Sequence, residues 1–210
     1  MRVLRKINIG FLLTVIVVIS VCIYCVNIEL SRKKEKEPIQ EAAQDFLNVV
    51  DKYLVLPKEY QKVDVKIDKT KDKSNFDSYY DELKKDLKNV MNREQSIDIQ
   101  MRVIEYQVSS QIDETRNIRL DYTKKITKIR SYVFDDNQVS IQFDAKVTIK
   151  TKYLDENFET GEKEEKEKEK SFNTTYEEMT LEKVDNKWKV VYANLQYEDL
   201  NGYEYESAMF

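Results

Sequence analysis

An uncharged apolar run near the N-terminus constrains this chain more than any other feature. Residues Ile7 to Ile28 read INIGFLLTVIVVISVCIYCVNI and contain no charged side chain. An α-helix rises about 1.5 Å per residue, so about 20 residues cover a hydrocarbon core of about 30 Å. We therefore expect a single-pass transmembrane anchor over residues 7–28, with the lipid bilayer as its partner and residues 1–6 as a basic tail.

Two other processing routes would use the same run. A signal peptide has an apolar region of about 7–15 residues and a small-x-small cleavage site. This run is longer, and the segment that begins at Glu29 contains no Ala-x-Ala pattern, which favours an uncleaved anchor. Cys22 and Cys25 leave a lipoprotein as an alternative, although Val21 and Tyr24 stand where lipid attachment usually needs a small residue. The simplest interpretation of both cysteines is apolar filler inside the bilayer.

The orientation of the anchor depends on the basic residues beside it. Arg2, Arg5 and Lys6 precede the run, and further Lys and Arg follow it, so counting alone does not decide the matter. A short basic tail before a first apolar segment normally stays inside, and a long following domain can be translocated regardless of its charge. We expect a cytoplasmic N-terminus and an extracytoplasmic domain at the cell membrane, with the opposite orientation as the alternative.

The composition excludes several classes of function. The net charge is -4 and the basic tail contributes +3, so the rest of the chain carries -7. This acidic balance argues against a nucleic-acid partner, which needs clustered Lys and Arg. The chain has no His and only three Gly, which excludes His-dependent triads, His-containing zinc sites and glycine-rich cofactor loops. We therefore expect no cofactor. With no Cys after Cys25, the domain has no disulfide to stabilise it.

The first half of the domain has helical periodicity. Residues 29–37 form a charged linker, and Pro38 suits the first turn of a helix that Pro57 ends. Apolar residues between them recur at spacings of three and four, which predicts one buried face. Residues 58–75 are polar and predict a loop, with a short alternating piece from Val63 to Ile67 that could form a weak strand.

Two further helices are expected before the chain changes period. The first covers Phe76 to Met91, with Ser74 or Asp77 as its N-cap. The segment from Glu94 to Asn117 fits an alternating strand and a helix, but steps of three and four from Ile97 to Ile112 favour the helix.

From Ile118 onward the apolar residues alternate, which predicts strands. The expected strands are residues 118–134, 139–154, 172–184 and 187–195, with turns at 135–137 and 185–186. Residues 155–170 mix Lys and Glu densely and predict a solvated, mobile hairpin tip, with an electrostatic contact arm as the alternative.

In the last predicted strand, alternation places Trp188, Val190 and Tyr192 on one face, with Trp188 in the core. The aromatics of residues 202–210 could dock, but termini of this kind often fray.

Two triplets of Asp, Glu and Asn residues are candidate metal sites. Asp135, Asp136 and Asn137 form one, and Asp155, Glu156 and Asn157 form the other. Both lack the Gly and the terminal Glu of a calcium loop, so turns are the better interpretation and no metal is expected.

Helices followed by antiparallel strands predict an α+β fold. We expect a cone-shaped domain over residues 38–200, with about three helices packed on a curved four-stranded antiparallel sheet and a tail at 201–210. The order of elements and the ending LEKVDNKWKVVYANL (Leu181–Leu195) resemble the nuclear transport factor two-like superfamily. With VIEYQVSSQI (Val103–Ile112), they are similar to the membrane-proximal domain that precedes amidase-like domains in exported proteins of spore-forming Firmicutes. The sequence ends soon after this region, so no enzymatic domain is expected to follow.

The resemblance implies a membrane-anchored binding or scaffold module in a cell-envelope, conjugation, secretion or sporulation assembly, in contact with other proteins or as a homo-oligomer. The absence of Cys after Cys25 is ordinary for an exported Gram-positive protein, and the bias toward Lys, Ile, Asn, Glu and Tyr suits an AT-rich genome. The alternative is a small-ligand or enzymatic domain that uses the cone as a pocket. Its candidate lining residues are Tyr79, Tyr80, Tyr106, Tyr122 and Asp144. Enzymes of the superfamily often pair Asp or Tyr with His, which this chain lacks, so the expectation is a non-enzymatic protein.

Overall fold

The computed structural model describes residues 9–65, 67–68, 71–113, 117–157, 160–198 and 204–206 of the chain. The chain divides into two units, residues 1–39 and 40–210. The basic tail, residues 1–6, lies outside the described residues, as do Tyr203 and Phe210 among the C-terminal aromatics.

Helix α1 (Ile9–Tyr53) begins in the first unit and ends in the second. Among the described residues it is the one helix long and apolar enough to cross a membrane, and none of its apolar window is buried. The expectation that a helix begins at Pro38 was wrong, because α1 continues without a break through the linker and through Pro38. The Lys and Glu residues of the linker are strong helix formers, which explains this continuity.

The second unit contains the end of α1 and two further helices. These are α2 (Lys73–Val90) and α3 (Glu94–Asp113), which confirm both predicted helices. Helix α2 begins after Asp72, so Ser74 and Asp77 lie inside it and neither is its cap. Between α1 and α2 the described residues contain a 3-10 helix, η2 (Lys58–Tyr60), and no strand at Val63. The prediction of a weak strand there was wrong.

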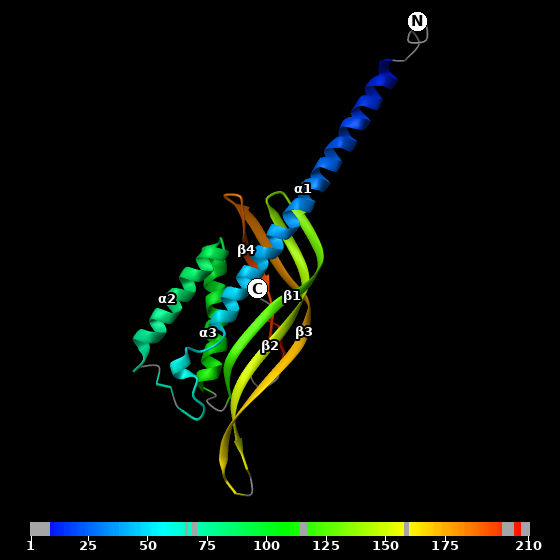
Figure 1. Cartoon of the computed structure of the whole chain (residues 1–210). Helices are drawn as coiled ribbons and strands as arrows, with labels where there is room; N and C mark the ends of the chain where they lie inside the picture. Colours follow the sequence, from blue (N-terminus) through cyan, green and yellow to red (C-terminus); the bar gives the residue numbers. More distant parts are fainter. Residues whose placement is uncertain are drawn as a thin grey trace. The chain divides into compact units, whose positions relative to one another are not determined.

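Four antiparallel strands form the main sheet and confirm the α+β prediction. In the order in which they pair, they are β1 (Asn117–Asp135), β2 (Gln138–Glu156), β3 (Lys163–Val184) and β4 (Lys187–Asn194). Figure 1 shows α2 and α3 beside each other at one side of these long, twisted strands. A short second pair, β5 (Gln196–Glu198) with β6 (Glu204–Glu206), was not predicted.

The two faces of the sheet differ in polarity. Along β2, every second residue from Val139 to Ile149 is buried, whereas the residues between them are exposed or half-buried. This alternation confirms the predicted half-buried strand. We call the buried side the inner face and the other side the outer face.

The turn between β3 and β4 has the backbone that its sequence predicts. Asp185 and Asn186 have φ angles of 49° and 63°. Two successive residues with positive φ are typical of a type I′ turn, whose twist matches that of the strands it joins.

The described part of residues 155–170 forms the exposed end of the β2–β3 hairpin, as predicted, but it is mostly strand, so the prediction of a loop was wrong. Strands β2 and β3 remain paired as far as Glu156 and Lys163. On the outer face, Lys150 lies 2.6 Å from Glu167 and Lys152 lies 3.3 Å from Glu165. Alternation places these opposite charges on one face of the hairpin arm (residues 150–170), so the same charge density that predicted a loop supports a strand pair.

A bulge in β3 decides which of its side chains enter the core. Phe143 pairs with Glu177 and Ala145 with Thr174, so Thr175 and Tyr176 together oppose Asp144. Thr174 and Glu177 are buried, whereas Thr175 and Tyr176 are exposed. Tyr176 has a φ of 60°, a left-handed conformation that is uncommon for a bulky residue.

A second irregularity lies between β3 and β4. Thr180 pairs with Tyr192 and Leu181 with Val190, which leaves Val191 as an extra residue. Trp188 and Val190 are buried as predicted, but Tyr192 is 38% exposed. The prediction that these three side chains share one face was therefore wrong, because the extra residue reverses the alternation.

Candidate functional site

Three of the five tyrosine and aspartate candidates lie on the helices. Tyr79 and Tyr80 are neighbours on α2, with ring centroids 5.4 Å apart. The Tyr79 hydroxyl donates a hydrogen bond to the carbonyl oxygen of Tyr53 at 2.7 Å. Burial, followed by the nearby charge of Glu105, raises the pKa of Tyr80 to about 12. Tyr106 is 60% exposed on α3. The structure brings only Tyr79 and Tyr80 together, and Tyr79 helps to join α2 to α1.

The remaining two candidates lie on opposite faces of the sheet. Tyr122 is buried on the inner face of β1, whereas Asp144 belongs to the outer face of β2. The Asp144 carboxylate accepts a hydrogen bond from Arg130 Nε at 2.5 Å, and this contact lowers its pKa. The five residues therefore do not line a common pocket.

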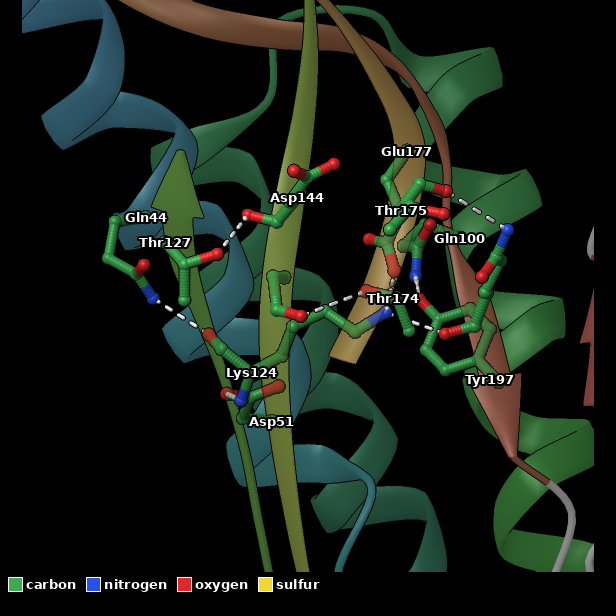
Figure 2. Close-up of polar contacts among 12 residues, drawn as sticks. Gln44, Asp51, Gln100, Lys124, Thr127, Asp144, Thr174, Thr175, Glu177 and Tyr197 are labelled. Atoms are coloured by element: carbon green, nitrogen blue, oxygen red, sulfur yellow. Dashed lines mark hydrogen bonds and ion pairs between the residues drawn. The ribbon is translucent and has the colours of Figure 1, made fainter. Parts of the chain in front are cut away.

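A buried ion pair between β1 and β3 is the most unusual polar feature of the core. Lys124 Nζ lies 2.8 Å from Glu177 Oε1, and the two side chains are 1% and 0% exposed. The same ammonium group donates to the Gln196 carbonyl oxygen at 2.6 Å and lies 5.2 Å from the Tyr197 ring. Burial lowers the pKa of Lys124, against the opposing effect of the Glu177 charge. Figure 2 shows these contacts.

Asp51 at the end of α1 adds a second buried carboxyl group. Its Oδ2 accepts the backbone N–H of Lys124 at 2.6 Å, whereas its Oδ1 has no hydrogen-bond partner in the structure. Burial raises the pKa of Asp51 to about 7, against the hydrogen bond and charge of Lys124. We call Asp51, Lys124 and Glu177 the buried triad.

Phenol and amide groups surround the buried triad. Gln100 Nε2 on α3 donates to the Tyr197 hydroxyl at 3.2 Å. The Tyr122 hydroxyl is buried without a hydrogen-bond partner in the structure, as is Glu177 Oε2. Burial raises the pKa of the Tyr122 and Tyr197 hydroxyl groups, so both stay neutral at physiological pH.

The triad lies where α1 covers the free edge of β1. Gln44 of α1 donates through Nε2 to the Lys124 carbonyl oxygen at 2.9 Å and accepts the Ile126 N–H at 2.9 Å. Together with the hydrogen bond from the Lys124 N–H to Asp51, these contacts replace those of a neighbouring strand. Figure 2 shows Gln44 and Asp51 beside Lys124. Buried backbone groups need such partners, so the two side chains close an edge that would otherwise be open.

A small apolar pocket opens at the other edge of the sheet. It has a volume of about 120 Å³ and is lined by Met91, Ser96, Ile99, Gln100, Val191, Tyr192 and Ala193. Gln100 belongs both to this lining and to the contacts of Tyr197. Among the described residues, no group of three or more His, Cys, Asp or Glu is placed to hold a metal ion.

The sequence patterns did not predict the buried triad. A signal was present on β1, where Lys124 alternates with Tyr122 and Ile126 and therefore faces inward. No equivalent signal marked Glu177, whose inward position depends on the bulge at Tyr176. Asp51 lies within the predicted apolar helix, but its partner is the edge of a strand 73 residues away.

Comparisons of the chain with protein-family models, curated proteins and solved structures find no match.

Proposed function

We propose that the chain is a non-enzymatic binding or scaffold module held at the outer face of the cell membrane by α1. The observation that carries the proposal is the apolar part of α1. Its large side chains from Phe11 to Val26 are between 36% and 67% exposed. So many exposed apolar residues on one helix are unfavourable in water and favourable in a bilayer. The orientation, with the α+β unit outside, rests on the basic tail.

The geometry of the buried triad argues against catalysis by these residues. Lys124 and Glu177 contact each other, Lys124 also donates to the Gln196 carbonyl oxygen, and neither side chain is open to solvent. A catalytic acid or base must reach a substrate atom, and these two groups would first have to lose their mutual contact. We therefore assign the triad a structural role in the module.

The outer face of the sheet is the surface we propose for a protein partner. Val133 is 62%, Tyr176 59% and Tyr192 38% exposed. The Arg130 guanidinium lies 4.2 Å from the Tyr176 ring. Tyr and Arg, together with Trp, are enriched among the residues that dominate protein interfaces. The partner could belong to a cell-envelope, conjugation, secretion or sporulation assembly, or be a second copy of this chain.

Two experiments test this function. The first places a single cysteine at Thr160 in a Cys22→Ser/Cys25→Ser background and labels intact cells with a membrane-impermeant maleimide. Labelling in intact cells is expected, and labelling only after lysis would contradict the outside orientation.

The second experiment places a photocrosslinker at Tyr176 or, as the control, at Tyr106 on α3. Crosslinks to a defined protein at Tyr176 alone support the outer face, and equal or absent crosslinks contradict it.

The apolar pocket beside Tyr192 favours a second candidate, a carrier of a small apolar ligand. Its lining combines apolar side chains with the polar groups of Ser96 and Gln100, as ligand pockets commonly do. Native mass spectrometry of the purified chain would support this function through a bound small molecule that Ala193→Trp removes.

A further inference from the structure

The buried triad contains two carboxyl groups and only one ammonium group. Lys124 Nζ is directed to Glu177 and to the Gln196 carbonyl oxygen, at 2.8 and 2.6 Å. Asp51 accepts one hydrogen bond, from the backbone N–H of Lys124. Its Oδ1 has no hydrogen-bond partner, even though the residue is buried, with only 7% of its surface exposed. An isolated buried carboxylate is strongly disfavoured and takes up a proton instead.

We infer that Asp51 is a proton-binding site of the neutral pH range, and that its bound proton holds the last turns of α1 against the edge of β1. In the protonated form Oδ1 carries the proton and Oδ2 keeps its hydrogen bond from the Lys124 N–H. Loss of the proton would place a second anion beside the Lys124–Glu177 pair, in a region with little solvent to stabilise it.

The groups that face Asp51 support this assignment. The charges that act on it come from Lys124 and Asp121 on β1 and from Glu177 on β3. The phenols of Tyr122 on β1 and Tyr197 on β5 lie close enough to sense its charge. Of these groups only Lys124 favours the charged form of Asp51. Burial has a larger effect than the hydrogen bond and charge of Lys124, and it raises the pKa of Asp51 to about 7.

The neighbours of Asp51 on its own helix have a different partner. Lys52 Nζ and the Tyr53 hydroxyl both donate to Asp86 Oδ2 on α2, at 2.9 and 2.8 Å. These contacts direct the Lys52 charge toward α2. Lys52 therefore does not supply the positive charge that Asp51 would need to stay ionised.

The proton couples pH to the contact between α1 and β1. When α1 separates from the edge, Asp51 meets water and its pKa returns to the ordinary value of 3.8. Because the pKa is higher in the closed state, the closed state is favoured at low pH and loses stability as pH rises toward 7. Linkage predicts that the equilibrium constant for opening rises about tenfold from pH 5 to 6, about fivefold from pH 6 to 7 and about twofold from pH 7 to 8.

Hydrogen exchange of the full chain in nanodiscs measures this opening directly. The reporters are the backbone amides of Lys124 and Ile126, which donate to Asp51 and Gln44. After correction for the intrinsic pH dependence of exchange, their protection is expected to fall by the factors given above between pH 5 and 8. Protection that stays constant over this range would overturn the proposal.

Two variants separate Asp51 from general effects of pH. Asp51→Asn keeps an acceptor for the Lys124 N–H but binds no proton, so its protection is expected to be independent of pH. Asp45→Asn makes the same change at an exposed position of the same helix, and it should keep the pH dependence of the unsubstituted chain. The same slope in Asp51→Asn as in the unsubstituted chain would overturn the proposal.

A direct titration covers the case in which Asp51→Asn fails to fold. The side-chain carboxyl carbon of Asp51 is followed by NMR in the unsubstituted chain as pH changes. A midpoint near 7 supports the proton-binding site, and a midpoint below 5 overturns it.

Discussion

Lys124 Nζ and Glu177 Oε1 lie 2.8 Å apart in a place where both side chains are almost wholly buried. The pair joins β1 to β3, two strands that do not neighbour each other in the sheet. The Lys124 ammonium also reaches the Gln196 carbonyl oxygen, just after β4. A single side chain therefore connects three separate segments of the core.

Replacing one member of this pair should destabilise the domain strongly. In Lys124→Met the Glu177 carboxylate loses its partner while it stays buried, which costs about 3–5 kcal/mol. Urea unfolding of the purified chain, followed by Trp188 fluorescence, measures the loss. The control is Lys150→Met, which breaks the exposed pair with Glu167 and should cost less than about 1 kcal/mol. Equal losses in both variants would contradict a special role for burial.

Gln44 should stabilise the domain through its hydrogen bonds to the edge of β1 rather than through contacts within its own helix. Gln44→Ala removes the partners of the Lys124 carbonyl and the Ile126 N–H, and a loss of about 1–3 kcal/mol is expected. Gln40→Ala removes the same side chain at an exposed position of α1. Because Ala is the better helix former, this control should not destabilise the domain. Thermal unfolding of both variants makes the comparison.

The turn between β3 and β4 offers a stabilising substitution. Asn186 has a φ of 63°, which Gly adopts more readily. Asn186→Gly should therefore stabilise the domain by a few tenths to about 1 kcal/mol, whereas Asn186→Val should destabilise it by about 1–2 kcal/mol. The denaturant midpoints of the unsubstituted chain, Asn186→Gly and Asn186→Val give the order of stability. If Asn186→Val were as stable as Asn186→Gly, the type I′ turn would be contradicted.

Cross-strand ion pairs should order the hairpin arm without stabilising the core. Lys150→Ala combined with Lys152→Ala removes the contacts to Glu167 and Glu165, so amide exchange in residues 163–170 should become faster. The unfolding midpoint should change by less than the equivalent of about 1 kcal/mol, because these pairs are exposed. High salt should reproduce the effect in the unsubstituted chain. Lys168→Ala, on the opposite face of the arm, is the control and should change the exchange less.

Much of the fold followed from local patterns in the sequence. Spacings of three and four predicted α2 and α3, including the ambiguous segment from Ile97 to Ile112, and strict alternation predicted β2. These patterns are reliable because each depends only on which face of one element meets the core. High charge density predicted an irregular linker and an irregular hairpin arm. Both predictions were wrong, because Lys and Glu support a helix or a strand pair when their spacing allows it.

By itself, the sequence determined the apolar helix, the order of helices and strands and most of the inward-facing residues, because all of these follow from periodicity along a short stretch of chain. Only the tertiary structure decided the bulge at Tyr176 and the extra residue at Val191, since both depend on the register between paired strands. Each of these irregularities reverses the alternation that follows it. The first turns Glu177 inward, where Lys124 and Asp51 meet it from β1 and α1, and the second turns Tyr192 outward. The buried triad is therefore a product of strand register, which no local pattern records.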